Sequence, residues 1–208
     1  MSYLKKYEWE IHPNKLPIVR RNCPKCNQKT NYINTEKFRV NANKNSIDVW
    51  LIYQCEKCKS TWNMTIYERV NSVDINNQEY GKFLSNDKEL VKKYAFDLRI
   101  YNKNKAEVIL EDVNYEVNQK ELEAFYINKN ELVIEIICRY PIELRVDTLL
   151  SNKLRISRSK IKRLHERGII FINDENNSLN KRVRNKMEIH VLNIVENIEI
   201  IESIVQVV

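Results

Sequence analysis

The fold is indicated most clearly by residues 145–192, which read RVDTLLSNKLRISRSKIKRLHERGIIFINDENNSLNKRVRNKMEIHVL. Two successive leucines lie on one side of a short helix that the pattern predicts over residues 147–153. Ser157 can cap a second helix that runs to residue 167. Gly168 follows at the position where a left-handed residue ends a helix. The stretch therefore predicts two short, consecutive helices.

Two short strands follow this helix pair, over residues 169–172 and 188–192, and a polar connection joins them. From Arg145 to His190 the sequence holds twelve Lys and Arg against five Asp and Glu, a net charge of +7. A compact helix–helix–strand unit with basic residues around one short helix is typical of a nucleic-acid binder. The other interpretation is a charged face that is simply solvated.

The same stretch resembles the RNA-binding domain named after ribosomal small-subunit protein four. The shared pattern keeps the family's order and spacing at Arg145, Val146, Asp147, Leu149, Leu150, Ser157, Arg158, Ser159, Gly168, Ile170 and Asn173. It departs from the family at Asp174, Asn185 and Lys186, where turn glycines or a Gly-Asp pair are usual. The resemblance implies that the helix pair grips structured RNA through Arg145, Ser157, Arg158, Lys160, Lys162 and Arg163. We add the neighbouring basic residues Arg167, Lys181, Arg182 and Arg184 to this RNA-binding set.

The second informative feature is a pair of Cys-x2-Cys turns, Cys23-Pro-Lys-Cys26 and Cys55-Glu-Lys-Cys58, separated by 28 residues. Each turn places two thiolates on one side, and four sulfurs complete the tetrahedron that structural zinc prefers. Residues 38–40 and 47–54 alternate like strands around a turn-rich segment, so a hairpin returns the chain to the first turn. The pattern predicts a zinc ribbon whose metal ligands are Cys23, Cys26, Cys55 and Cys58.

Three other interpretations of these cysteines compete with zinc. A redox pair needs only one Cys-x2-Cys turn, disulfides need an oxidising compartment, and iron also accepts four thiolates. Residues 1–15 contain no apolar signal segment, so we expect reduced thiols and a cytoplasmic protein. Four cysteines leave no open coordination position, so the expected zinc is structural. The basic residues around the turns either offset thiolate charge or face phosphates: Arg20, Arg21, Lys25, Lys29, Lys57 and Lys59.

Charge is spread unevenly along the 208 residues, whose formal net charge is +7. Residues 1–70 carry +7, residues 71–144 carry −4 and residues 145–208 carry +4. No apolar run approaches a membrane span, so we expect no membrane partner. The predicted fold class is α+β in three parts: an N-terminal zinc ribbon over 1–70, an acidic α/β connector over 71–144, and a basic RNA-binding module with a C-terminal extension over 145–208.

Weaker signals predict further elements. Residues 85–87, Ser-Asn-Asp, can start an amphipathic helix that continues to Leu98. Residues 106–110 and 132–138 read as strands, the second of which ends before Pro141. Near the C-terminus, the apolar spacing suits a helix stripe, but the β-branched content equally allows a strand: Ile194, Ile198, Ile201 and Val205.

Three blocks around the second cysteine pair are distinctive: residues 37–43 (KFRVNAN), 48–53 (DVWLIY) and 61–63 (TWN). Together with the cysteines, they resemble a bacterial family catalogued as domain of unknown function 1062, a resemblance that extends over nearly the whole chain. It implies no activity. We expect the strand aromatics to form ribbon core, although an exposed subset could stack on unpaired bases: Trp50, Tyr53, Trp62 and Tyr67.

An enzyme is the main rival class. With only Gly81 and Gly168, the chain lacks a dinucleotide fingerprint and a phosphate-cradling loop. Its three histidines lie in unrelated motifs, so the sequence indicates no catalytic triad: His12, His165 and His190. We therefore expect a non-catalytic protein that binds structured RNA, such as ribosomal or transfer RNA. The alternatives are an adaptor whose ribbon binds a protein partner, and an RNA-modifying enzyme whose site is not recognised.

Overall fold

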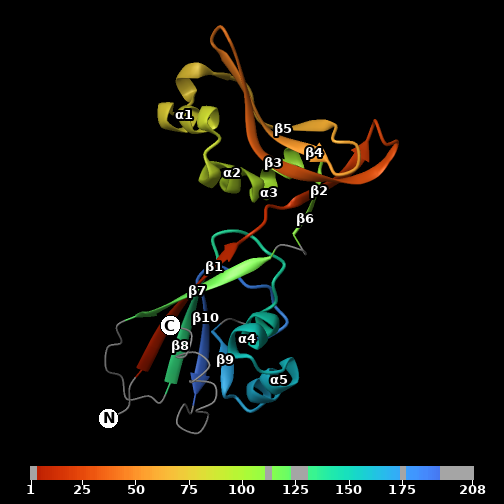
Figure 1. The fold of residues 1–208 in the computed structure, drawn as a ribbon. Coiled ribbons are helices and arrows are strands. Elements are labelled where there is room, and N and C mark those ends of the chain that lie inside the picture. The colour runs from red at the N-terminus through yellow and green to blue at the C-terminus, as the bar shows by residue number, and fades with distance from the viewer. Residues whose placement is uncertain (1–3, 111–113, 123–130, 174–176, 193–208) are drawn as a thin grey trace. The chain divides into compact units, whose positions relative to one another are not determined.

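The computed structural model describes residues 4–110, 114–122, 131–173 and 177–192, and the chain is α+β, as expected (Figure 1). It divides into two compact units. Unit 1 combines Met1–Asn14 with Asn114–Val208, and unit 2 is the continuous segment Lys15–Val113. This division differs from the three consecutive parts expected from charge, because the first strand pairs with strands from the far end of the chain.

Unit 1 is built on a five-stranded sheet in the order β7-β1-β8-β10-β9. Strand β1 (Leu4–Pro13) pairs antiparallel with β7 (Tyr115–Leu122) and parallel with β8 (Glu131–Ile137). Strand β10 (Met187–Leu192) joins β8 to β9 (Ile170–Ile172), antiparallel to both. β1 therefore lies inside a sheet whose other strands all come from residue 115 onward, and it belongs to unit 1.

The helix pair of unit 1 follows the predicted pattern. Helix α4 (Val146–Leu154) buries both of its predicted leucines, and α5 (Arg158–Glu166) buries Ile161 and Leu164. The Ser157 side chain accepts a hydrogen bond from the Lys160 N–H at 3.2 Å and caps α5. Gly168 follows the last helical turn with φ of +69°, where glycine is favoured. The helices, the cap and both strands after them are confirmed.

Unit 2 is built on an antiparallel sheet in the order β5-β4-β3-β2-β6. Its strands are β2 (Ile18–Cys23), β3 (Gln28–Asn43), β4 (Ser46–Cys55), β5 (Thr61–Asn71) and β6 (Glu107–Ile109). β3 and β4 form the predicted hairpin, in which Tyr32 is paired with Cys55. The hairpin therefore returns the second Cys-x2-Cys turn to the first.

Three helices follow β5 and the short 3-10 turn at Ser72–Asp74: α1 (Asn77–Ser85), α2 (Lys88–Ala95) and α3 (Leu98–Lys103). Their buried side chains join those of the sheet in one hydrophobic core. Asp87 caps α2, as predicted. The helix ends before Leu98, however, because Asp97 caps a separate helix, α3, through the Arg99 N–H at 3.0 Å.

The acidic middle of the sequence does not form a part of its own. Its helices and β6 belong to unit 2, whereas β7 and β8 belong to unit 1. The undecided C-terminal stripe, Ile194 to Val205, lies outside the described residues. Within the described part of the chain, no helix is long and apolar enough to cross a membrane.

Candidate functional site

Two backbone turns of the same shape position the four cysteines in unit 2. The Asn27 N–H donates to the Cys23 carbonyl at 2.8 Å, and the Lys59 N–H donates to the Cys55 carbonyl at 3.0 Å. Asn27 and Lys59 both adopt left-handed backbone angles, with φ of 56° and 61°. Each turn thus reverses the chain directly after its second cysteine. The two ends of the β3–β4 hairpin bring the turns face to face.

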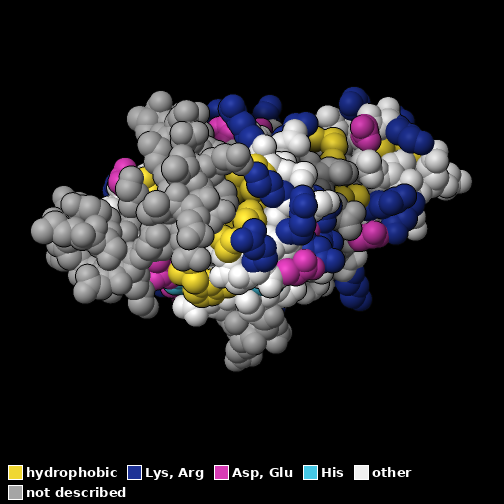
Figure 2. All heavy atoms as spheres, turned by 90° about the horizontal axis from the view of Figure 1, so that it is seen from below, with side chains coloured by type: hydrophobic (Ala, Val, Ile, Leu, Met, Phe, Trp, Pro, Cys, Tyr) yellow, Lys and Arg dark blue, Asp and Glu magenta, His cyan; other side chains and the backbone are white. Residues whose placement is uncertain are grey.

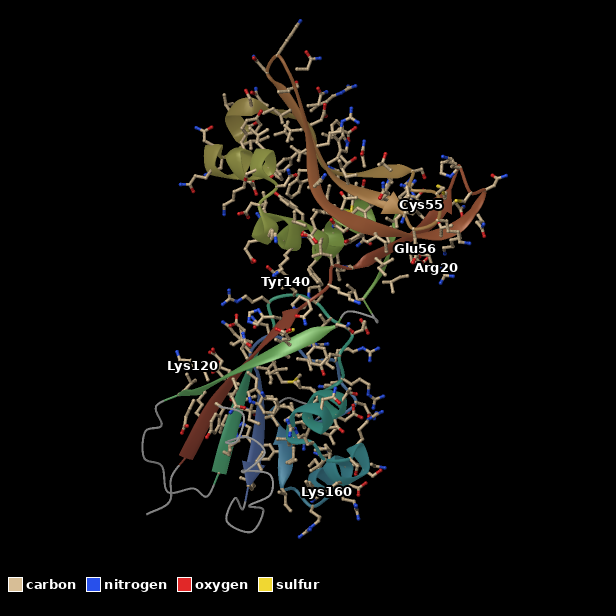
Figure 3. The ribbon with its side chains drawn as sticks, in the orientation of Figure 1. Arg20, Cys55, Glu56, Lys120, Tyr140 and Lys160 are labelled. Carbon is tan, nitrogen blue, oxygen red and sulfur yellow. The ribbon has the colours of Figure 1, made fainter. Side chains whose placement is uncertain are left out.

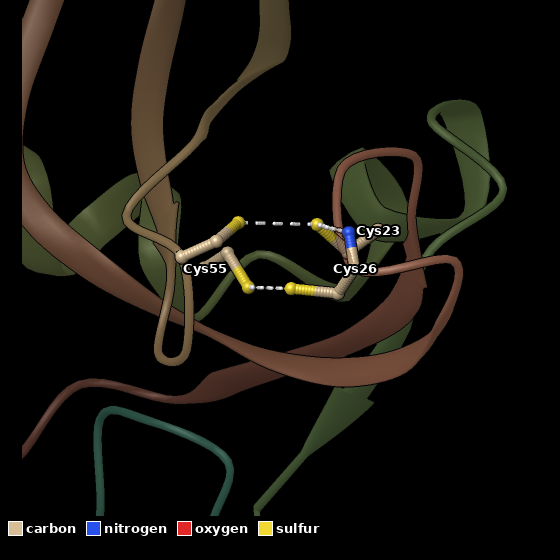
Figure 4. A group of neighbouring side chains, drawn as sticks. Cys23, Cys26 and Cys55 are labelled. Atoms are coloured by element: carbon tan, nitrogen blue, oxygen red, sulfur yellow. Dashed lines mark hydrogen bonds between the residues drawn. The ribbon is translucent and has the colours of Figure 1, made fainter.

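The four sulfurs converge, and all of them lie within 4.8 Å of one another (Figure 4). Cys23 Sγ is 3.5 Å from Cys58 Sγ, and Cys26 Sγ is 3.9 Å from Cys55 Sγ. Four sulfurs at about 2.3 Å from a central ion would be about 3.8 Å apart in a tetrahedron. All four cysteines are free of disulfide bonds. The cluster is therefore compatible with a tetrahedral metal site, as the spacing predicted.

Hydroxyl groups surround three of the sulfurs. Ser60 Oγ is 3.4 Å from Cys23 Sγ and 3.1 Å from Cys58 Sγ, so it contacts one sulfur of each turn. Thr30 Oγ1 is 3.3 Å from Cys55 Sγ. Hydrogen bonds from Ser60, then from Tyr32, lower the pKa of the Cys23 thiol to about 5. These hydroxyls favour the thiolate, which is the form that binds metal.

The clustered thiols differ in how readily they ionise. The neighbouring Cys58 sulfur first, and burial second, raise the pKa of the Cys26 thiol to about 12, whereas the pKa of the Cys23 thiol is lowered. Burial opposes ionisation of Cys55 as well, but hydrogen bonds from the Cys58 backbone and from Thr30 lower its pKa overall. A divalent cation removes this mutual repulsion, which is why four clustered thiols favour metal binding.

The basic residues around the turns have different environments. The Arg21 guanidinium packs over the Trp62 ring, 4.2 Å from its centroid, and burial lowers its pKa. Lys29 pairs with Glu107 at 2.5 Å. The other four are exposed: Arg20, Lys25, Lys57 and Lys59. Arg20 is paired with Asn31 on β3, whose carbonyl accepts from the Glu56 N–H at 2.9 Å, so Arg20 lies on a strand two positions across the sheet from the second cysteine turn (Figure 3).

In unit 1, a buried carboxylate joins the two helices. Asp147, only 7% exposed, accepts hydrogen bonds from Arg145 Nε and Nη2 at 3.0 and 2.9 Å. It also accepts from Arg158 Nε and Nη2, at 3.0 and 2.5 Å. Burial alone would raise the pKa of Asp147, but hydrogen bonds from the two arginines outweigh burial and lower it. Asp147 is therefore an ionised anchor for two guanidinium groups.

This arginine pair borders an open pocket of about 640 Å³. The loop that closes the pocket is held against α4 by its backbone, because Val146 N–H donates to the Lys181 carbonyl and Asp147 N–H donates to the Leu179 carbonyl. The lining side chains are mostly polar: Arg145, Asp147, Arg158, Ser159, Lys162, His165, Asn177, Ser178, Leu179 and Asn180. Arg145 also donates to Asn180 across the pocket. The pocket can accept an anionic, hydrogen-bonding ligand.

Comparison with known proteins gives the family. A family model described as "Protein of unknown function (DUF1062)" matches residues 40–176. The chain belongs to this family. The match includes Cys55, Cys58 and the helix pair, but Cys23 and Cys26 precede it. No curated protein and no solved structure matches the chain.

In this DUF1062 chain, three of the ten expected RNA-binding residues meet at the pocket: Arg145, Arg158 and Lys162. The others lie elsewhere on the module. By helical spacing, Lys160, Arg163 and Arg167 lie on the other flank of α5. Ser157 caps the helix, Arg182 pairs with Glu143, Arg184 is exposed and Lys181 is half-buried. Figure 3 labels Lys160 on α5, and several Lys and Arg side chains are exposed in the view of Figure 2.

The pocket also contains residues outside the expected set: Asp147, Ser159, His165, Asn177, Ser178, Leu179 and Asn180. Asp147 could have been found from the shared pattern, since it stands two residues after Arg145. The loop residues carry no local signal, because contacts with residues far away in the sequence place them there: the start of α4 donates to the Leu179 and Lys181 carbonyls, and Arg145 donates to Asn180.

Proposed function

We propose that this DUF1062 protein binds structured RNA through α4, α5 and the adjacent loop of unit 1, without chemistry of its own. The observation that carries the proposal is the pair of arginines held by Asp147 at the edge of a polar pocket. Ribosomal and transfer RNAs are the ligands that the resemblance of this module favours.

The arginine pair is suited to phosphate. A guanidinium carries five N–H donors, and Asp147 engages the Nε and Nη2 groups of each arginine. The Arg158 side chain is 54% exposed, so donors remain for a ligand. Asp147 neutralises only one of the two positive charges and holds both groups in place, which reduces the ordering cost on binding. Lys162 adds a third positive charge beside them.

The other flank of α5 extends the surface. Arg163 and Arg167 are exposed there, so basic side chains occupy both sides of one helix. A helix with its side chains is about 10–12 Å wide. Contacts on both flanks can therefore reach phosphates on two strands of a folded RNA. This geometry favours a structured RNA over an isolated single strand for this module.

The pocket contains a carboxylate and a histidine, which are common general acids and bases in enzymes, but the contacts of both groups favour binding over catalysis. Two arginines hold the pKa of Asp147 below its usual value, which makes this carboxylate a weak general base. His165 Nδ1 is 2.9 Å from the Ile170 carbonyl, a contact that fixes the ring to β9. Binding is therefore the better proposal.

We propose structural zinc for the cysteine cluster. Four sulfur ligands leave no open position for a substrate, and the contacts between 3.5 and 3.9 Å match a tetrahedral ion of this size. Iron has the same geometric fit, and elemental analysis distinguishes the two. In the adaptor alternative, unit 2 with its zinc bound contacts a protein partner.

The experiment measures binding of the full chain to a stem–loop RNA at several salt concentrations. The test variant is Lys162→Ala with Arg163→Ala, one residue from each flank of α5. It should weaken binding and flatten the salt slope by about 0.9 per lost contact, with the B-DNA value as a rough guide. Lys44→Ala with Lys88→Ala, exposed lysines of unit 2, is the matched control. An unchanged affinity and slope in a folded test variant would show that α5 is only solvated.

A further inference from the structure

One face of the unit 2 sheet is open. Burial alternates strictly along β4, and its buried residues, from Ile47 to Cys55, belong to the core beneath the helices. Helices α1, α2 and α3 contribute their buried side chains to that core, on one side of the sheet (Figure 1). The alternate residues of β4 point to the opposite side. This opposite side, which we call the open face, is partly exposed along the whole strand.

Trp50 lies in the middle of the open face. It is paired in register with Arg39 on β3 and with Thr65 on β5. The Arg39 guanidinium carbon lies 5.9 Å from the centroid of the Trp50 ring. Of the four strand aromatics, Tyr53 is in the core, and Trp62 and Tyr67 pack against it. Trp50 belongs to neither group, so its ring is available on the other side of the sheet.

Towards the cysteine turns, the residues that follow Trp50 and Arg39 on this face are polar and uncharged, or apolar. The next pair along the strands is Ile52 with Asn63, and the one after it is Gln54 with Thr61. Ile33, paired with Gln54, is 41% exposed. The open face therefore combines one large aromatic ring, one adjacent guanidinium and several amides and hydroxyls.

We infer that the open face binds unpaired RNA nucleotides, with Trp50 and Arg39 as the stacking platform. The inference rests on the proposed RNA binding, because it names a second contact for the same partner. Every base has a π face that stacks on an aromatic ring or on a guanidinium plane. The amides and hydroxyls beside Trp50 offer donors and acceptors for base edges.

The charge of the open face also favours a polyanion. Arg39 lies at Trp50, and Arg20 is exposed on β2 towards the cysteine turns. Two of the nearby acids are engaged: Asp48 accepts a hydrogen bond from the Arg69 N–H at 2.8 Å, and Glu107 pairs with Lys29 at 2.5 Å. Glu56 is exposed.

The experiment compares two RNAs on the full, metal-loaded chain: a blunt stem–loop and the same stem–loop with a five-nucleotide unpaired tail. Trp50→Ala should weaken binding of the tailed RNA by about 5- to 150-fold, the range expected for one lost stacked base. Binding of the blunt RNA should not change. Trp50→Phe, which keeps an aromatic ring, should recover most of the loss. Leu84→Ala, an exposed apolar residue on α1, is the matched control.

A free pentanucleotide separates this inference from the proposed function. It should quench the fluorescence of the wild-type protein, and Trp50→Phe should remove that quenching. Quenching without any stem–loop binding would support the open face and overturn the role of α5. A blunt RNA that binds as tightly as the tailed one, with no quenching, would overturn the inference alone. An equal loss of affinity for both RNAs in Trp50→Ala would mean that Trp50 has only a structural role. A protein crosslinked at position 50 in cells, without RNA, would assign the open face to a protein partner.

Discussion

The Asp147 anchor allows the sharpest test of the energetics of unit 1. Asp147→Asn keeps the size of the side chain and removes its charge. The two guanidinium groups then lose a carboxylate that accepts two hydrogen bonds from each of them. An amide has one acceptor oxygen and cannot satisfy all four donors. The substitution should therefore destabilise the contact between α4 and α5.

The magnitude follows from burial. Removing one partner of a fully buried ion pair costs about 3–5 kcal/mol, whereas exposed pairs contribute about 0.2–1 kcal/mol. Asp147 is 7% exposed, but the Arg145 and Arg158 side chains are 35% and 54% exposed. The pair with Arg145 falls between the two limits, and the pair with Arg158 is close to the exposed limit. We expect a loss of about 2–3 kcal/mol in the free energy of unfolding of unit 1.

Amide hydrogen exchange measures this loss of stability at the affected helix. The Leu149 amide donates to the Arg145 carbonyl at 3.0 Å in the first turn of α4, so its exchange reports on that helix. A loss of 2–3 kcal/mol corresponds to about 30- to 150-fold faster exchange. Asp97→Asn is the matched control, because Asp97 pairs with Arg99, whose side chain is 89% exposed, and asparagine still caps α3. Equal effects of the two substitutions, each below about 0.5 kcal/mol, would refute the anchor.

The effect of pH has a defined sign. The pKa of Asp147 is lower in the folded protein than in the unfolded chain, where it is about 3.9. The stabilisation by its charge is therefore fully present above about pH 4 and is lost as pH falls through the lower, folded pKa. The exchange difference between wild type and Asp147→Asn should stay constant from pH 7 to about pH 5 and shrink in acid. A difference that shrinks above pH 5 would contradict this assignment.

Three further predictions concern metal, hydroxyl and glycine. Elemental analysis should find one zinc per chain. Cys23→Ser should accelerate amide hydrogen exchange throughout unit 2 but leave the Gly168 amide protected, and a uniform loss of protection would mean that the units are not independent. Ser60→Ala should weaken metal binding about 10- to 100-fold in a chelator competition, whereas Ser85→Ala should leave it unchanged; equal affinities would remove Ser60 from the site. In urea titrations, Gly168→Ala should lower the free energy of unfolding by about 1–2 kcal/mol because the φ of Gly168 is +69°, whereas Gly81→Ala, inside α1, should raise it by about 0.5–1 kcal/mol. Neither added Cβ meets an atom within 4 Å, so effects of the same sign would contradict the backbone explanation.

Several elements could be predicted because their causes are local. The Ser157 cap depends on an N–H three residues later, and Gly168 depends on its own backbone angle. Along β4, buried and partly exposed side chains alternate from one residue to the next, as expected for a strand with one buried face. The Cys-x2-Cys turns require only the chain within each turn. Such signals survive in the sequence because each contact spans a few positions.

The division into units could not be predicted in the same way. The acidic stretch from 71 to 144 suggested a connector, yet its helices complete one core and its strands β7 and β8 complete another. Strand β1 has an alternating pattern that would suit many sheets. Its place between β7 and β8 depends on register and burial shared with residues far along the chain, which no local pattern specifies.

By itself, the sequence determined the grouping of the four cysteines, the helix pair with its cap and its terminating glycine, and the family to which the chain belongs. The tertiary structure alone decided that Arg145 and Arg158 share Asp147, that the loop at 177–180 lines their pocket, and that Trp50 points away from the helix-covered core. The physical reason is the range of the interactions. Caps and turns are made within a few residues, whereas a shared carboxylate, a pocket wall and the choice of the buried sheet face depend on which distant surfaces pack together.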